Sequence, residues 1–299
     1  MSTIRQPVLR GTWYPADPVD LAAAADQFIA GADPKLRPAG RPLLAMVPHA
    51  GYVFSGRTAG KLFGLLRDTP VRRIVILAPN HRIALDRIAL SGAAAFATPL
   101  GVVEVDQDAV RQLAENESFI KNDQAHAQEH AIEIQLPLIQ RTWIGAVPRI
   151  IPMLVPSLTG AQARGAAAAL ARLADSNTLF LVSTDFTHYG ASYGFVPFTE
   201  NLPAALEELD SGAILKILAG DADGLREYGR RSGITMCGLE AAAIALEQGL
   251  PPGYEAALID YSRSGDRDGD YSLSVSYASI LVCAGTDRNT PSKGGDDDR

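Results

Sequence analysis

Residues 41–56 read RPLLAMVPHAGYVFSG, and this stretch decides the fold. The apolar run from Leu43 to Val47 is short and is closed by a proline, which predicts a buried strand. A polar turn with His49 follows, and Arg57 to Leu66 predicts a helix entered from a loop over residues 51–56. A buried strand, a short turn and a helix in this order indicate an α/β fold.

The same pattern of a strand followed by a polar turn recurs further along the chain. Ile74 to Ala78 precedes APNHR with His81, and Leu179 to Val182 precedes STDFTHYG. Further strands are expected at Gly101 to Val105, Arg149 to Val155, Tyr254 to Tyr261 and Leu273 to Val282. Further helices are expected at Leu21 to Ala30, Gln107 to Ala114, Ala131 to Ile139 (with Pro137 breaking its end), Ala161 to Ala174, Leu202 to Leu209, Gly212 to Ala219, Ala222 to Tyr228 and Gly238 to Gln248.

This alternation predicts a three-layer α/β domain with a largely parallel or mixed central sheet. The chain has 299 residues and 47% hydrophobic content, enough for a large core, and a single domain over residues 1–285 is favoured. The charged tail, residues 286–299, has no apolar anchor and is expected to be disordered.

The charge and the cysteines narrow the class of protein. A net charge of −7 without a Lys/Arg run gives no sign of a nucleic-acid surface. The sequence contains no apolar stretch of membrane-spanning length and no signal-peptide pattern. Two isolated cysteines do not form a disulfide framework. A cytoplasmic protein that does not bind membranes is therefore expected.

Histidines at strand ends point to a metal site. His49 and His81 each follow an expected strand by a proline-bearing turn. The carboxyl ends of parallel strands meet at one edge of a sheet, where α/β proteins bind their ligands, and neutral imidazole is the commonest protein ligand for metals. The alternative is that each histidine is bonded to backbone near the surface, but two equivalent positions favour one shared site.

STDFTHYG and the two cysteines supply further candidates. If Asp185 to His188 form one turn, the carboxylate would orient the imidazole, which could then act as a general base. Asp185 could also cap a turn. Cys237 precedes an expected helix, and a helix N-terminus lowers a thiol pKa and favours a metal-binding thiolate. An inert, buried thiol is the alternative, and it is the interpretation favoured for Cys283.

HAQEH, with His126, Glu129 and His130, matches the H-x-x-E-H pattern of some zinc peptidases. Short motifs of this kind arise often by chance, and this one would leave the other three histidines unexplained. Glu129, His130, Glu133 and Tyr52 are therefore expected to line the pocket or to support its ligands.

Six segments of the chain together resemble the Memo family in their order and spacing. They are RGTWYP, PHAGYVFSG, LAPNHR, EHAIEIQLP, STDFTHYG and MCGLEAAAIAL. The bacterial and archaeal members are called AmmeMemoRadiSam system protein B. The resemblance covers roughly residues 10–283. It implies a fold similar to the class III extradiol dioxygenases, which use non-haem iron(II).

The resemblance also implies a pocket in which His49, His81 and Cys237 bind a metal, with His188 close by. Iron and copper are the metals it suggests, and zinc fits the same donors. Cys237 stands where the dioxygenases have a carboxylate, and a soft thiolate shifts the preference toward copper(I) or zinc and away from ring cleavage.

Two functions follow from these expectations. One is a metal-dependent oxidoreductase acting on an unknown small substrate, with His188 and Asp185 moving protons. The other is a non-catalytic module that binds a metal, small ligand or peptide and works with the radical-SAM and AMMECR1-type proteins that the family name implies. The zinc peptidase is a third, weaker candidate.

Overall fold

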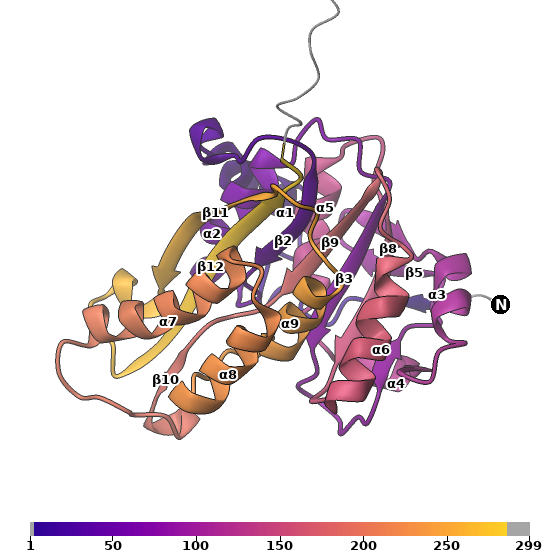
Figure 1. Cartoon of the computed structure of the whole chain (residues 1–299). Coiled ribbons are helices and arrows are strands. Elements are labelled where there is room, and N and C mark those ends of the chain that lie inside the picture. Colours follow the sequence, from indigo (N-terminus) through magenta and orange to yellow (C-terminus); the bar gives the residue numbers. More distant parts are fainter. Residues whose placement is uncertain (1–2, 286–299) are drawn as a thin grey trace, which may run out of the picture.

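The computed structural model describes residues 3–285, and a nine-stranded mixed sheet runs through its centre (Figure 1). The strands follow the order β10-β12-β2-β9-β3-β8-β4-β7, and β11 pairs with β12. Their bounds are β2 Pro42–Val47, β3 Arg73–Pro79, β4 Ile88–Leu90, β7 Phe119–Lys121, β8 Arg149–Val155, β9 Thr178–Ser183, β10 His188–Gly190, β11 Glu255–Arg263 and β12 Leu273–Cys283.

The middle of the sheet is parallel and almost entirely buried. Strand β9 lies between β2 and β3 and is parallel to both, and β3 is also parallel to β8. Strands β12 and β4 run antiparallel to their neighbours β2 and β8. The apolar runs of the sequence form these central strands because a parallel strand is covered on both faces. The predicted mixed α/β sheet is therefore confirmed.

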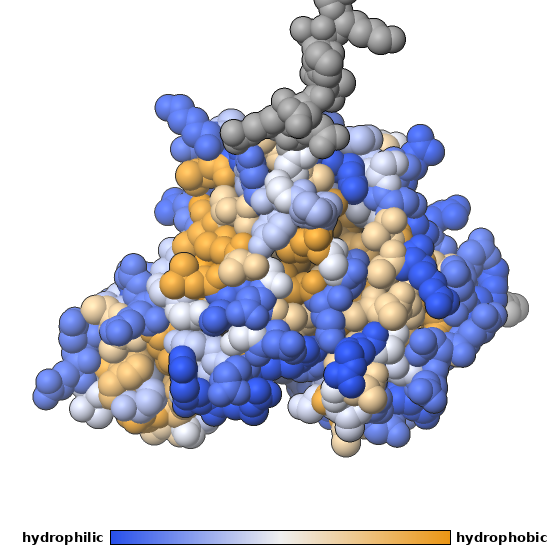
Figure 2. Space-filling model, viewed as in Figure 1, coloured by the Kyte–Doolittle hydropathy of each residue, from blue (hydrophilic) through white to orange (hydrophobic). Residues whose placement is uncertain are grey.

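Helices cover both faces of the sheet and complete three layers (Figure 1). On one face α1, α2 and α5 pack together, and on the other α6 and α8 pack against α9, which contacts β3 and β9. The helices are α1 Pro18–Ala30, α2 Tyr52–Leu65, α3 Gln107–Leu113, α4 Asp123–Ala127, α5 Leu136–Thr142, α6 Gly160–Ala171, α7 Leu202–Leu218, α8 Ala222–Ser232 and α9 Leu239–Glu247. Polar side chains cover α8, whereas apolar residues gather near β11 and β12 (Figure 2).

A small sheet lies beside the main one, and only its last strand, expected at Gly101 to Val105, was predicted. It has the order β1-β5-β6, with the bounds β1 Ile4–Arg5, β5 Ala95–Thr98 and β6 Gly101–Glu104. Strands of two to four residues rarely show a hydrophobic period, which is why β1, β4, β5, β7 and β10 were not predicted.

Four predicted helices differ from the structure. Residues 52–56, expected in a loop, already belong to α2, because Gly51 is its N-cap. Pro137 does not break a helix but lies in the first turn of α5, where its missing N–H costs nothing. The two helices expected between Leu202 and Ala219 form one helix, α7. Its buried Asp210 finds hydrogen-bond partners in neighbouring segments.

Two further predictions concern the charged tail and the lack of a membrane-spanning segment. The charged tail, residues 286–299, lies outside the described residues. Within residues 3–285, each helix is too short or too polar to cross a membrane.

Helix α1 packs closely against α2, the helix that begins three residues after His49. An ideal Cβ at Gly60 of α2 would lie 2.3 Å from Phe28 Cβ and 2.6 Å from its carbonyl carbon. Gly60→Ala is therefore expected to destabilise the protein by about 1–3 kcal/mol, although alanine favours helices by up to about 1 kcal/mol. Chemical denaturation measures the effect.

Gly160→Ala is the matched control for this prediction. At that exposed position in the first turn of α6, the new Cβ would meet only the end of the flexible Arg164 side chain, at 3.2 Å. Its unfolding free energy should stay unchanged or rise slightly. Equal effects of both substitutions would show that α1 and α2 can separate without cost.

Candidate metal centre

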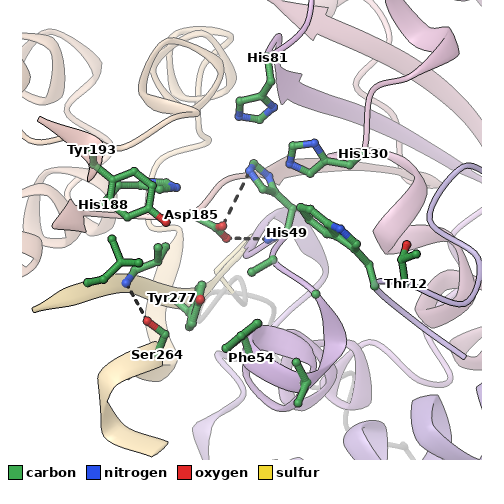
Figure 3. A pocket seen from close by; sticks show the side chains of 16 residues that line it. Thr12, His49, Phe54, His81, His130, Asp185, His188, Tyr193, Ser264 and Tyr277 are labelled. Atoms are coloured by element: carbon green, nitrogen blue, oxygen red, sulfur yellow. Dashed lines mark hydrogen bonds and ion pairs between the residues drawn. The ribbon is translucent and has the colours of Figure 1, made fainter. Parts of the chain in front are cut away.

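The predicted site residues gather where the central strands end. His49 lies two residues after β2, His81 two residues after β3 and Asp185 two residues after β9. They face a cavity of about 570 Å³ (Figure 3). The lining residues are Thr12, Trp13, His49, Ala50, Gly51, Val53, Phe54, His81, His130, Asp185, His188, Tyr193, Ser264, Leu273, Val275 and Tyr277.

Three imidazoles converge at one side of this cavity. One ring nitrogen from each of His49, His81 and His130 lies within 4.8 Å of the other two. The His81 and His130 rings stack with their centroids 4.6 Å apart, and the His49 ring meets both edge-on at 5.3 Å (Figure 3). Three imidazoles are a ligand set suited to zinc, copper, iron or nickel. The three residues can therefore hold a metal ion.

Hydrogen bonds fix which nitrogen His49 offers. Ser183 Oγ donates its only proton to Ala131 O at 2.6 Å, so it accepts from His49 Nδ1 at 3.2 Å. This leaves Nε2 of His49 unprotonated, with the Cys237 thiol 3.2 Å away. Burial, together with His130 and His81 nearby, lowers the pKa of His49 well below its usual value. The ring is therefore neutral, which is the form that binds metals.

Glu129 orients the His81 ring and lies in contact with the His130 ring. Its buried carboxylate accepts from the backbone N–H groups of His81 and His130, both at 2.8 Å, and from His81 Nδ1 at 3.0 Å. His130 Nδ1 lies 3.1 Å from the same oxygen as His81 Nδ1. Burial would raise the pKa of Glu129, but these contacts with His130 and His81 lower it far below the usual range. An ionised carboxylate behind a histidine fixes its tautomer and strengthens it as a ligand.

The donor set fits a metal ion. Metal–nitrogen bonds of about 2.0–2.1 Å with tetrahedral angles place donors roughly 3.3 Å apart, so small ring rotations close the group. All three rings line the cavity, so an ion held by them would adjoin the space in which a small molecule can bind.

Cys237 lies beside His49 and outside the group of three formed by His49, His81 and His130. Its Sγ is 3.2 Å from His49 Nε2 and accepts from the Asp185 N–H at 3.3 Å. The expected low thiol pKa is wrong, because burial and the neighbouring Asp185 carboxylate raise the pKa of Cys237. Helix α9 begins at Leu239, two residues after Cys237. The N-terminus of the helix therefore does not offset the rise in thiol pKa that burial and Asp185 cause.

Asp185 and His188 do not form the expected turn. His188 begins β10, which pairs with β12. Asp185 instead accepts from the His49 N–H at 2.7 Å, and its other oxygen lies 4.0 Å from His49 Nε2 (Figure 3). Burial raises the pKa of Asp185. This carboxylate therefore supports His49 rather than His188.

Backbone carbonyls orient His188. Its Nδ1 lies 3.0 Å from Phe186 O and 3.1 Å from Thr235 O, and since a carbonyl only accepts, Nδ1 carries the proton. The Nε2 lone pair remains free on a ring that lines the cavity beside Tyr193, across from the three imidazoles (Figure 3).

The two histidines of HAQEH diverge. His126 Nε2 donates to Ala89 O at 3.0 Å, and its ring is buried against Phe96. Helix α4 ends at Ala127, so His126 and His130 do not share a helical face. These residues therefore do not form the zinc site of the peptidase pattern.

Glu133 and Tyr52 lie behind the cavity wall. Glu133 is fully buried, and its carboxylate binds residues near the N-terminus of the chain. Tyr52 is also buried, and its hydroxyl donates to Ile134 O at 3.2 Å. Both residues support the segment that carries His130 rather than facing a ligand.

The sequence-based prediction missed several members of the site. It placed His130 in the pocket or its support, whereas His130 is one of the three grouped imidazoles. It named no aromatic wall apart from Tyr52, although Trp13, Phe54 and Tyr277 line the cavity. Trp13 belongs to RGTWYP, so that motif was the available signal.

Comparisons with known proteins show which family the chain belongs to. Residues 5–281 match the model of the Memo-like protein family. A MEMO1 family protein of Thermoplasma volcanium is 31% identical over 282 residues, which cover 94% of this chain and 98% of the relative. Another, of Thermococcus onnurineus, is 34% identical, covering 93% of this chain and 99% of the relative. A third, of Aquifex aeolicus, is 30% identical, with 93% and 98% covered. The chain therefore belongs to the Memo family.

Proposed function

We propose that this protein is a metal-dependent oxidoreductase that acts on a small molecule bound in the cavity. The convergence of His49, His81 and His130 at one wall of a 570 Å³ cavity carries the proposal. A cavity of this size accommodates a small organic molecule. A copper or non-haem iron ion held there would supply the redox chemistry.

Cys237 is proposed as a further ligand. Its Sγ lies 3.2 Å from His49 Nε2, so a shift of the thiol toward the cavity brings it to the same ion. Metal binding displaces the thiol proton even where the pKa is raised. A donor set of imidazoles and one thiolate favours copper(I) or zinc over the iron chemistry of ring cleavage.

His188 is proposed to move protons. Its Nδ1–H is held by two carbonyls, so Nε2 can accept a proton from a substrate hydroxyl or thiol in the cavity. Apolar side chains such as Phe54 and Tyr277 line the cavity, which favours binding of an apolar substrate body and exclusion of water.

A non-catalytic binding module is the second candidate. Val53, Phe54 and Leu273 at the cavity mouth are 63%, 46% and 49% exposed. An apolar rim of this kind suits contact with a partner, and radical-SAM and AMMECR1-type proteins are the partners that the family name suggests.

Metal analysis followed by turnover measurements tests the proposal. Protein purified anaerobically should contain one copper, iron or zinc ion per chain. The copper- or iron-loaded protein should oxidise members of a panel of catechols and thiols, with oxygen consumption as the readout, and should not cleave peptides. His188→Gln should retain the metal and lose about 10²–10⁴-fold in turnover. Metal binding with no turnover on any compound would favour the binding module, and absence of metal binding would overturn the oxidoreductase.

A further inference from the structure

Residues 5–14 converge on one buried carboxylate. Glu133 accepts from the N–H groups of Val8 and Leu9, both at 2.9 Å, and from the Tyr14 hydroxyl at 2.5 Å. The Arg5 guanidinium pairs with the same carboxylate. Glu133 is fully buried, so these contacts offset the cost of removing its charge from water.

Arg5 also holds the segment that precedes Glu133. Its Nη2 donates to Glu129 O at 2.7 Å and its Nε to His126 O at 3.1 Å. One buried guanidinium therefore contacts both ends of the stretch from His126 to Glu133. His130 lies inside that stretch, so its backbone is fixed from both sides.

The same N-terminal segment touches the metal centre directly. The Trp13 ring lies 4.6 Å from the His130 ring, centroid to centroid, and lines the cavity. Trp13 O accepts from the Tyr52 N–H at 2.9 Å, at the start of α2 just after His49. The segment therefore contacts two of the three stretches that carry the grouped imidazoles.

We propose that Arg5 and Glu133 are positioning residues of the metal centre, which set the His130 imidazole and the Trp13 wall of the cavity together. The proposal rests on the metal centre proposed above. Breaking the Glu133 contacts separates residues 5–14 from the segment that carries His130. The His130 imidazole then moves out of position, although all three histidines are still present in the chain.

Trp13 provides the probe, because the chain has only two tryptophans, Trp13 and Trp143. In a Trp143→Phe background, all tryptophan emission comes from Trp13 beside His130. Added Co²⁺ or Cu²⁺ should quench this emission, and the Co²⁺ absorption spectrum reports the donor set.

Glu133→Gln in this background tests the role of the carboxylate. We expect the Kd for Co²⁺ to rise about 10–100-fold, as for other groups that hold metal ligands in place. The cobalt spectrum should show fewer nitrogen donors, Trp13 quenching should weaken, and its emission in metal-free protein should shift to longer wavelength. Arg5→Lys keeps the positive charge but loses the several N–H donors of the guanidinium, so it should give an intermediate result. This variant replaces Glu133→Gln in the test if Glu133→Gln does not fold.

Asp210→Asn is the matched control. Asp210 is also a fully buried carboxylate, which accepts from Thr187 and Tyr261 but does not contact the His130 segment. This variant should lose stability while keeping the Co²⁺ affinity, spectrum and quenching of the parent.

The outcomes separate the two proposals. If Glu133→Gln and Arg5→Lys keep the parent's Kd, cobalt spectrum and Trp13 emission, the positioning role is wrong and Glu133 serves the fold alone. If the parent itself binds neither Co²⁺ nor Cu²⁺, the metal centre is wrong. The Trp13 emission of metal-free protein then still decides whether Arg5 and Glu133 hold Trp13 against His130.

Discussion

His49→Ala is expected to abolish metal binding while leaving the protein folded. His49 is the most buried of the three grouped imidazoles, at 2% exposed, and it is held neutral with Nε2 unprotonated. Its removal leaves His81 and His130 alone. We expect an affinity loss beyond the roughly 10–100-fold that follows removal of a group supporting a ligand.

Thermal unfolding with and without metal measures this effect. Metal at 100 times its Kd stabilises the native state by about 2.7 kcal/mol, and His49→Ala should show none of that gain. The metal-free variant should still unfold cooperatively, because the central strands and the helices that cover them are unchanged.

His126→Ala is the control for the metal loss. His126 lies outside the group of three, with its ring nitrogen on Ala89 O. This variant should lose some stability and still gain the full metal-dependent shift, whereas His81→Ala should lose most of it. Equal losses in the His126 and His81 variants would return HAQEH to consideration as the metal site.

His126 is expected to make the metal-free protein sensitive to mild acid. Burial lowers the pKa of His126 from 6.5 to about 4, partly offset by its bond to Ala89 O and by Asp123. Between these two values the unfolded chain binds a proton that the folded protein does not, so stability falls as the pH falls from 6.5 to 4. The difference corresponds to about 3 kcal/mol.

His126→Gln isolates this contribution. The side-chain amide of the variant can still donate to Ala89 O but does not titrate. At pH 7 the parent should be the more stable protein, and by pH 4 that advantage should shrink by about 3 kcal/mol in urea denaturation. All other titrating groups are shared by the two proteins and cancel in the difference. An advantage that stays constant from pH 7 to pH 4 would mean that His126 is protonated inside the fold.

The sequence predicts the strand ends of the site well, because that part depends on local patterns. Short apolar runs closed by proline identify β2 and β3, and parallel strands share one edge, so His49 and His81 had to meet. The resemblance to a family added Cys237, which the structure places against His49.

Other parts of the site depend on contacts between distant segments. His130 lies in a short connection between α4 and Glu133 whose path is set by Glu129 and Arg5, and no local period encodes such a path. The rule for thiols at helix N-termini failed at Cys237 because burial beside Asp185 is the larger effect. The short strand at His188 depends on pairing with β12, which replaced the predicted turn.

The position of β9 between β2 and β3 determines when, during synthesis, His49 and His81 can come together. His49 and His81 sit on strands that become neighbours of β9 only after residue 183 has been made and inserted between them. A ribosome-bound chain of half this length thus lacks the strand that brings the two histidines into one place. An ion that needs both histidines can therefore bind only after residue 183 has been made, so we expect metal binding to follow the assembly of the central strands rather than to start it.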